Sequence, residues 1–160
     1  MDPTVEISRR QFIVDSALLG GGLAVGLASP DASGAEAGSE LNVWVVVKPD
    51  DTCVIRIARS EMGQGTLTGL AQLVAEELEC DWRKVTTESI TPGQNHAAKR
   101  AWGEMGTGGS RGIRTSQDYV RRAGAAARLM LVQAAADEWK VPVAELSAAN
   151  GLVTHRGSGR

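Results

Sequence analysis

The stretch "ARSEMGQGTLTGLAQLVAEELE", residues 58–79, predicts the end of a strand, a glycine turn and then a helix. Gln64 stands between two glycines at the turn, and glycine permits positive φ and a close approach of the backbone to a ligand. Thr66 or Thr68 is expected to cap the helix by accepting from a free backbone N–H. The stretch therefore predicts a ligand-facing loop that opens an amphipathic helix. The apolar residues beyond the turn recur at the spacing of one helical face: Leu67, Leu70, Ala71, Val74, Ala75 and Leu78.

Two strands are expected before this turn. Residues 41–48 alternate with period 2 and are rich in β-branched side chains, which predicts one strand. Residues 49–52 read Pro-Asp-Asp-Thr, a turn signal, and residues 53–58 alternate again. The short connection predicts a β-hairpin whose second arm leads directly into the glycine turn.

Further elements are expected beyond the first helix. Residues 85–90 predict a third strand, and residues 91–115 a loop that is long enough to be functional. Residues 116–139 predict a second helix that ends before Pro142, and the Asn-Gly pair at 150–151 predicts a second hairpin. The order hairpin, helix, strand, long loop, helix, hairpin is typical of an α+β fold. The apolar face of the second helix is expected to consist of Tyr119, Ala123, Ala126, Ala127, Met130 and Ala134.

The composition fits one modest globular domain. The chain has 160 residues, of which 42% are hydrophobic and 22% are charged. A formal charge of −2 does not suit a nucleic-acid binder. Cys53 and Cys80 are too few for a disulfide scaffold or a zinc site, so we expect buried thiols, with a bridge left open for an exported protein. His96 and His155 are expected to be isolated and solvated.

Residues 1–37 resemble an export signal. Residues 8–12 read Ser-Arg-Arg-Gln-Phe, which is similar to the bacterial twin-arginine motif. The uncharged stretch at residues 16–28 is shorter than the roughly 20 apolar residues that span a bilayer. Small residues at 32–37 suit a signal peptidase. We therefore expect a twin-arginine signal and a periplasmic protein, the alternative being an amphipathic N-terminal helix.

A second glycine loop precedes the second helix. Residues 106–112 read Gly-Thr-Gly-Gly-Ser-Arg-Gly. A helix N-terminus offers free N–H groups and the positive end of a dipole, which suits anionic groups. Arg111 and Arg114 beside this loop add forked donors that suit phosphate. Two such loops in one small domain predict a ligand with several polar or anionic groups, although each loop alone would also fit a plain turn and helix cap.

A nicotinamide dinucleotide site is one alternative. Gly63, Gly65 and Gly69 follow a strand and open a helix, and Glu88 near the end of the next strand could bind a ribose. Three features disagree with this alternative. The glycine spacing departs from G-x-G-x-x-G, the preceding strand reads as a hairpin arm rather than the first strand of a βαβ unit, and no further βαβ unit follows.

The two loops together resemble a known family. The motif at residues 61–65, Glu-Met-Gly-Gln-Gly, precedes a helix with Gln72 and a Trp82 segment, as in the molybdenum-cofactor-binding subunit of the xanthine dehydrogenase and aldehyde oxidase family. Residues 107–110 are similar to the family's small-residue run before its next helix. A first motif near the N-terminus, behind a twin-arginine signal, resembles the branch of isoquinoline 1-oxidoreductase β subunits. The resemblance covers nearly all of residues 41–160.

The resemblance implies a molybdopterin cofactor, commonly the molybdopterin cytosine dinucleotide form in bacteria. It implies that Gln64 hydrogen-bonds at the metal end, while Gly63 and Gly65 allow close backbone approach. It also implies hydroxylation of N-heterocycles or oxidation of aldehydes, a small 2Fe–2S partner subunit and, as a further candidate partner, a cytochrome c. The residues implied to hold the pterin or phosphate part are Thr107, Gly108, Gly109 and Ser110.

Two features of the family have no counterpart in this sequence. The family's general base is a glutamate in a Gly-Val-Gly-Glu-like segment, and a glycine-phenylalanine loop covers its metal, whereas the only phenylalanine here is Phe12. Glu61 and Glu104 adjoin the loops but are expected to be ordinary polar residues, so no catalytic residue is assigned. We therefore expect residues 38–160 to be the N-terminal part of a molybdopterin-binding domain in a longer subunit, inactive alone. The alternative is a truncated, non-catalytic chain.

Overall fold

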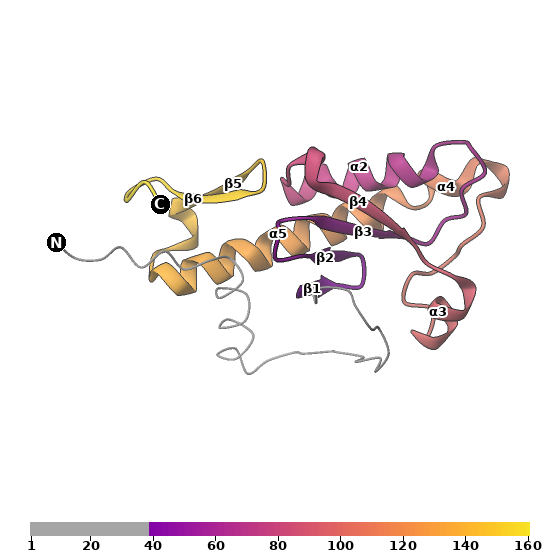
Figure 1. Ribbon diagram of the computed structural model, residues 1–160, viewed down its shortest axis with the longest axis horizontal. Coiled ribbons are helices and arrows are strands. Elements are labelled where there is room, and N and C mark those ends of the chain that lie inside the picture. The colour runs from indigo at the N-terminus through magenta and orange to yellow at the C-terminus, as the bar shows by residue number, and fades with distance from the viewer. Residues whose placement is uncertain (1–38) are drawn as a thin grey trace.

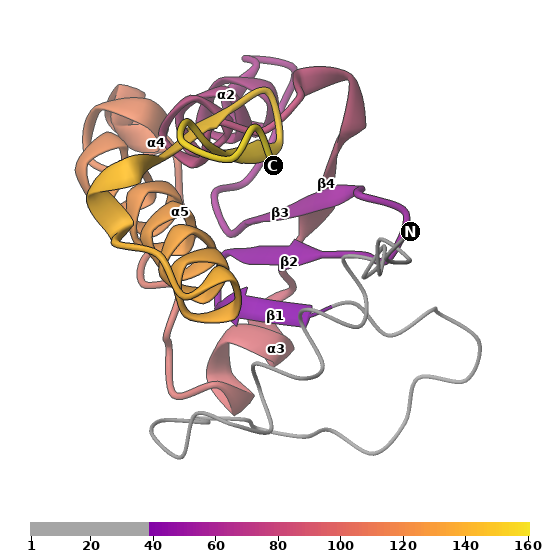
Figure 2. The ribbon, with the colours of Figure 1, turned by 90° about the vertical axis from the view of Figure 1, so that its left-hand side faces the viewer.

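The structure, a computed structural model, describes residues 39–160, so the expected export signal at residues 1–37 lies outside the described residues. Its main elements are β1 (Ser39–Asn42), β2 (Val45–Val47), β3 (Cys53–Ile57), α2 (Thr66–Leu78), β4 (Val85–Ser89) and α5 (Gln117–Trp139). The four strands form one sheet in the order β1-β2-β3-β4. Helices α2 and α5 lie side by side on one face of it, α2 against β3 and β4 and α5 against β1 and β2 (Figures 1 and 2). The mixed α+β architecture is as expected.

The expected single strand at residues 41–48 is wrong. The chain turns at residues 43–44, so β1 and β2 pair as an antiparallel hairpin before β3 adds the next antiparallel strand. Asn42 builds the turn, because its Oδ1 accepts from the backbone N–H of Trp44 at 2.9 Å and of Val45 at 3.1 Å. An Asn side chain that imitates a backbone turn in this way interrupts a strand, and the alternation of apolar residues does not reveal it.

β3, α2 and β4 form a βαβ unit. β4 pairs with β3 in parallel, and Cys53 lies opposite Val85 in the register. The strands expected at residues 53–58 and 85–90 are confirmed. One of the three arguments against a dinucleotide site is wrong, however, because β3 is at once a hairpin arm and the first strand of a βαβ unit.

The main hydrophobic core lies between the sheet and the two helices. The inward residues of β3 alternate, and Ile55 and Ile57 are at most 1% exposed. They pack against the apolar face of α2, which is buried as predicted except for the half-buried Leu67. The period-2 and period-3.6 patterns of the two elements therefore identify the face that each one buries.

The helix expected over residues 116–139 is confirmed as α5, but its predicted apolar face is only partly right, because Ala123 and Ala127 are buried whereas Ala126 is exposed. Met130, for example, is 50% exposed. The reason is Gly124, where an added Cβ would lie 2.5 Å from the backbone carbonyl oxygen of Val74. A glycine at this point lets the backbones of α5 and α2 touch, so small residues rather than large ones face the core. The buried residues of α5 are Val120, Ala123, Gly124, Ala127, Val132, Ala135 and Ala136.

The expected loop at residues 91–115 contains regular structure. Helix α3 (Pro92–Ala97) begins with a capping box in which Thr91 and Gln94 bond each other's backbone N–H groups. The indole N–H of Trp102 donates to the carbonyl of Val43 at 2.8 Å and connects this segment to the β1–β2 turn. A capping threonine followed by proline is a local helix signal that the length of the segment concealed.

The expected C-terminal hairpin is confirmed. β5 (Leu146–Ala149) and β6 (Leu152–His155) pair antiparallel in a second sheet that packs against α5. The expectation that His155 is solvated is wrong, because the residue is 7% exposed and its ring nitrogens lie 2.7 Å from Ser158 Oγ and 2.8 Å from Glu145 Oε2. His155 therefore belongs to the internal structure of this hairpin.

Both cysteines are thiols in the structure. Cys53 is buried in the main core, as expected, whereas Cys80 is only half-buried beside it. A hydrogen bond with the Cys53 thiol, together with burial, raises the pKa of the Cys80 thiol above its usual value. A raised thiol pKa disfavours the reactive thiolate, which agrees with a packing role.

Candidate functional site

The first glycine loop lies between β3 and α2. Gly63 and Gly65 have φ values of 89° and 81°, in the left-handed region that favours glycine. The Gln64 Nε2 donates to the carbonyl of Ser60 at 2.9 Å and to Thr66 Oγ1 at 2.8 Å. The two N–H groups of the amide that was expected to face a ligand are thus bonded to its own loop, and one of these partners must be exchanged before the amide can donate to a ligand.

Glu61 occupies the N-terminus of α2. Its backbone hydrogen bonds, that to Leu67 first and that to Gly65 next, hold the pKa of the Glu61 carboxyl below its usual value. The cap expected from Thr66 or Thr68 is wrong, because Gly65 is the N-cap residue and no side-chain cap is made. Glu61 is therefore a structural anion at the helix end rather than an ordinary polar residue. Its carboxylate oxygens accept at 2.7 to 3.1 Å from the backbone N–H groups of Met62, Gly63, Gly65 and Leu67.

The second glycine loop opens a short helix rather than the long one. Residues Gly108–Ser110 form a 3₁₀ turn, α4 (Arg111–Arg114) follows, and α5 begins only at Gln117. Gly109 and Ser110 have positive φ values of 67° and 57°. The glycine content thus serves a left-handed turn, as expected, but the first helix that it opens is a single turn.

The two arginines beside this loop bond back to it. Arg111 Nε donates to the carbonyl of Gly108 at 3.0 Å, and Arg114 Nη2 donates to that of Gly109 at 3.3 Å. The Arg111 side chain remains 48% exposed. These forked cations therefore stand at the rim of the second loop, where sequence reasoning expected phosphate-binding donors.

The structure brings the two loops side by side. A Cβ built on Gly112 of α4 would lie 2.6 Å from Thr66 Oγ1 and 3.3 Å from Thr107 Cγ2, so α4 packs directly on the start of α2. The backbone N–H of Ser60 donates to the carbonyl of Met105 at 2.8 Å. Figure 1 shows α2 and α5 running in the same direction away from this end of the fold. The positive ends of both helices therefore point toward the loop pair, by which we mean residues 60–65 and 106–112.

Arg59 is a residue of this region that sequence reasoning missed. Its side chain is 4% exposed and contacts the segment around the second loop, although the residue itself precedes the first loop. A signal was present, because Ile55 and Ile57 face inward and Arg59 occupies the next inward position by period 2. A charged residue at an inward position requires buried partners.

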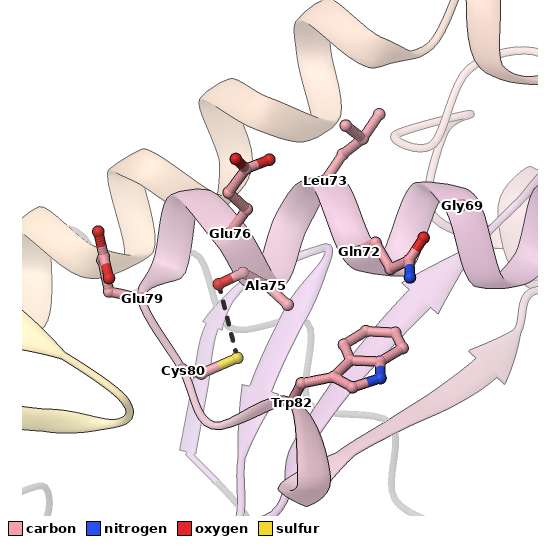
Figure 3. A pocket seen from close by; sticks show the side chains of 8 residues that line it. All are labelled: Gly69, Gln72, Leu73, Ala75, Glu76, Glu79, Cys80 and Trp82. Carbon is pink, nitrogen blue, oxygen red and sulfur yellow. Dashed lines mark hydrogen bonds between the residues drawn. The ribbon is translucent and has the colours of Figure 1, made fainter.

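A groove on the outer side of α2 begins one turn beyond the first loop (Figure 3). In the close-up, Gln72 and the Trp82 indole lie near one another at its right-hand side, and Cys80 bonds back to Ala75. None of the predicted site residues lines this groove. The groove and the loop pair are therefore separate features. The groove is lined by Gly69, Gln72, Leu73, Ala75, Glu76, Glu79, Cys80 and Trp82.

The sequence profile of one protein family, described as "Molybdopterin cofactor-binding domain", matches residues 7–160. The chain belongs to this family. The resemblance inferred from the two loop motifs is therefore confirmed at the level of the family.

Two curated relatives are similar to this molybdopterin cofactor-binding domain chain. Isoquinoline 1-oxidoreductase subunit beta of Brevundimonas diminuta is 38% identical over an alignment of 165 residues. The alignment covers 98% of this chain and 21% of the relative. A membrane-bound aldehyde dehydrogenase [pyrroloquinoline-quinone] of Gluconacetobacter polyoxogenes is 34% identical over 137 residues, which cover 79% of this chain and 17% of the relative. The chain thus spans about a fifth of the length of these relatives.

The loop pair has open backbone and exposed cations, which are the features that a molybdopterin requires. A Cβ built on Gly63, Gly65, Gly108 or Gly109 meets nothing within 4 Å, so the backbone at these points borders open space. The exposed arginine side chains at the second loop suit the phosphate of such a group. The polar atoms of a pterin ring can pair with the backbone groups that the glycines leave accessible. That Gln64 and Ser110 line one cavity remains a prediction.

The contacts of Glu88 and Glu61 disagree with the dinucleotide alternative. Glu88, which was its candidate ribose ligand, forms an ion pair with Arg56 at 3.1 Å. The carboxylate of Glu61 fills the helix N-terminus where the pyrophosphate of a dinucleotide would bind.

Within residues 39–160, no helix is long and apolar enough to cross a bilayer, and no cluster of three His, Cys, Asp or Glu side chains is placed to hold a metal ion.

Proposed function

We propose that the chain is a cofactor-holding part of the large subunit of a xanthine dehydrogenase-like molybdenum oxidoreductase. The observation that carries this proposal is the contact of the two glycine loops around Gly112, in a chain of the molybdopterin cofactor-binding domain family. Loops that are far apart in sequence, open to solvent and bordered by the exposed side chains of Arg111 and Arg114 form a surface suited to a polar, anionic ligand.

Each predicted site residue has a distinct part in this proposal. Gln64 presents its amide to the metal end of the cofactor after it releases Thr66 or Ser60, and Gly63 and Gly65 allow the loop to approach closely. Thr107 is 8% exposed and shapes the second loop from inside. The exposed Ser110 and the open backbone of Gly108 and Gly109 would then contact the pterin or its phosphate. The bound cofactor supplies the redox chemistry, and the protein binds and orients.

The proposal extends to features that lie beyond these residues. It includes hydroxylation of N-heterocycles or oxidation of aldehydes, the molybdopterin cytosine dinucleotide form, a 2Fe–2S partner subunit, a cytochrome c and twin-arginine export to the periplasm. The relatives support parts of it, since one is named subunit beta of an oxidoreductase and the other is named an aldehyde dehydrogenase. A truncated, non-catalytic chain is the alternative.

The test is a cofactor analysis of the complete gene product. Protein purified from a molybdenum-replete bacterial host should contain molybdenum, measured by mass spectrometry of metals, and pterin, measured by fluorescence after oxidation. Gln64→Ala should lower both by about tenfold, the usual effect of losing one positioning group at a metal centre. Gln133→Ala, which alters an exposed glutamine that bonds only Asp137 in the same helix, is the matched control and should keep both.

Two outcomes would contradict the proposal. If wild-type protein contains neither molybdenum nor pterin, the proposed function is wrong. Because the second relative's name includes pyrroloquinoline quinone, the same extract is assayed for that quinone, and its presence in place of pterin would also overturn the proposal. Unchanged molybdenum and pterin in Gln64→Ala would remove the role of Gln64 alone.

A further inference from the structure

We infer that Arg59 is a positioning residue that holds the second glycine loop against the first, so that the loop pair keeps one geometry. The effect of this residue on cofactor retention rests on the proposed function. The connection between the loops does not, because it is made by atoms of the chain itself.

The guanidinium of Arg59 bonds to both ends of the second-loop segment. At the start of the loop, Nη1 donates to the carbonyl of Gly106 at 2.5 Å and lies 3.5 Å from Glu104 Oε2. After the loop, Nε donates to Ser116 Oγ at 2.8 Å and Nη2 donates to Thr115 Oγ1 at 2.9 Å. One planar side chain therefore fixes where this segment enters and where it leaves.

The backbone next to Arg59 is fixed to the same segment. Ser60 follows it directly and starts the first loop, and both its backbone N–H and its hydroxyl donate to the carbonyl of Met105, at 2.8 Å and 3.1 Å. The chain thus reaches the second-loop segment through a side chain and through the next peptide. A displacement of either loop has to break these bonds together.

Burial explains why the connection is specific. The Arg59 side chain is 4% exposed, and Ser116 is 0% exposed. The Tyr119 hydroxyl donates to the same Ser116 Oγ at 2.7 Å, so the network continues into α5. A buried guanidinium that loses one acceptor retains an unpaired donor away from water, which is costly. Because each of its three nitrogens already bonds the chain and the side chain is buried, Arg59 acts on a ligand only through the loops that it positions.

The sharpest test compares Arg59, which lies two residues beyond β3, with Arg56, which lies within that strand. Arg56 bonds Glu40 and Glu88 and makes no bond to the second loop among the described contacts. Arg59→Lys keeps the charge but not the fork, Arg59→Met removes both, and Arg56→Met is the matched control. Hydrogen exchange is measured by mass spectrometry on the complete gene product made in a host that cannot synthesise molybdopterin.

In the cofactor-free protein, both Arg59 variants should exchange at least tenfold faster over residues 104–116, while residues 146–155 are unchanged. Arg56→Met should leave residues 104–116 as in wild type. Faster exchange with Lys as well as Met would show that the fork, and not the charge, makes the connection. Unchanged exchange over residues 104–116 would overturn the inference. Thr115→Val, which removes a single acceptor, replaces Arg59→Met if that variant does not fold.

In the cofactor-replete host, the Arg59 variants should retain several-fold less molybdenum and pterin, with Arg56→Met unchanged. If exchange rises but cofactor content does not fall, Arg59 connects the loops without serving the cofactor, and its inferred effect on cofactor retention is wrong. If wild-type protein contains no molybdopterin but the exchange difference is present, the proposed function fails while the connection stands.

Discussion

The first glycine loop is held mainly by its own residues, whereas the second depends on residues from elsewhere in the chain. In the first, Glu61 and Gln64 bond backbone groups within a few positions of themselves. In the second, the defining contacts come from Arg59 at one side and from Thr66, across Gly112, at the other. The bonds of the first loop are therefore local, whereas the position of the second loop depends on residues more than 40 positions earlier in the chain.

Because of this difference, substitutions in the two loops should have different effects. A change inside the first loop acts on local hydrogen bonds and on charge, because that loop is exposed. A change in the packing of the second loop acts on the contact between two distant segments. The following predictions separate these two kinds of dependence.

Gly112→Val should have the largest effect. Its new Cβ would lie 2.6 Å from Thr66 Oγ1 and 3.3 Å from Thr107 Cγ2. The second loop could then no longer pack against the start of α2. We expect the free energy of unfolding to fall by about 2–3 kcal/mol, typical of overpacking, measured by denaturant titration. Gly106→Ala, whose Cβ meets nothing within 4 Å, is the control. Equal stability of the two variants would show that the second loop does not depend on this contact.

Glu61→Gln should change the acid limb of the stability curve. The backbone N–H groups hold the pKa of Glu61 below its ordinary value of 4.5. Folding therefore gains from the ionised carboxylate above about pH 4.5, and this gain is lost as the pH falls further through the folded-state pKa. The variant should melt lower than wild type at neutral pH, and the gap should narrow below pH 4.5. Glu138→Gln is the control, and a gap that is constant with pH would contradict the role of the charge.

Ser110→Gly should have the smallest effect on stability and the opposite sign. Ser110 has a φ of 57°, a conformation that costs an L-residue about 1 kcal/mol and glycine little. Part of this gain is offset by the greater freedom of glycine in the unfolded chain, so we expect an increase of about 0.5 kcal/mol. Molybdenum content should nevertheless fall, since the hydroxyl is lost. A rise in stability with full cofactor content would remove Ser110 from the site.

The sequence could predict the elements whose signals are long and periodic. Residues 66–78 repeat an apolar position every turn, and the Asn-Gly pair at 150–151 permits few alternatives to a hairpin. The Asn42 turn could not be predicted from alternation, because one side chain replaces a backbone partner there. The buried face of α5 could not be predicted either, because it depends on Gly124, whose lack of a side chain lets α5 pack closely against α2.

For the candidate site, the sequence could identify the two loops but not how they are held. The glycines and Gln64 form motifs that can be recognised in order along the chain. The roles of Arg59 and Glu61 depend on partners that only the fold supplies, namely the carbonyl of Gly106 and the N-terminus of a helix. For Arg59, the available sequence signal was its spacing of two residues from the inward-facing Ile57. For Glu61, the sequence held no signal beyond its place before a helix.

The backbone contact between Gly124 and Val74 also bears on how far apart the loops stand. α2 and α5 run in the same direction and pack closely there, since a Cβ at Gly124 would lie 2.5 Å from the Val74 carbonyl oxygen. Because both helices lead back to the loops at their N-terminal ends, the distance between the two loops depends partly on this contact within the helices. A methyl group at position 124 would push the helices apart while touching neither loop.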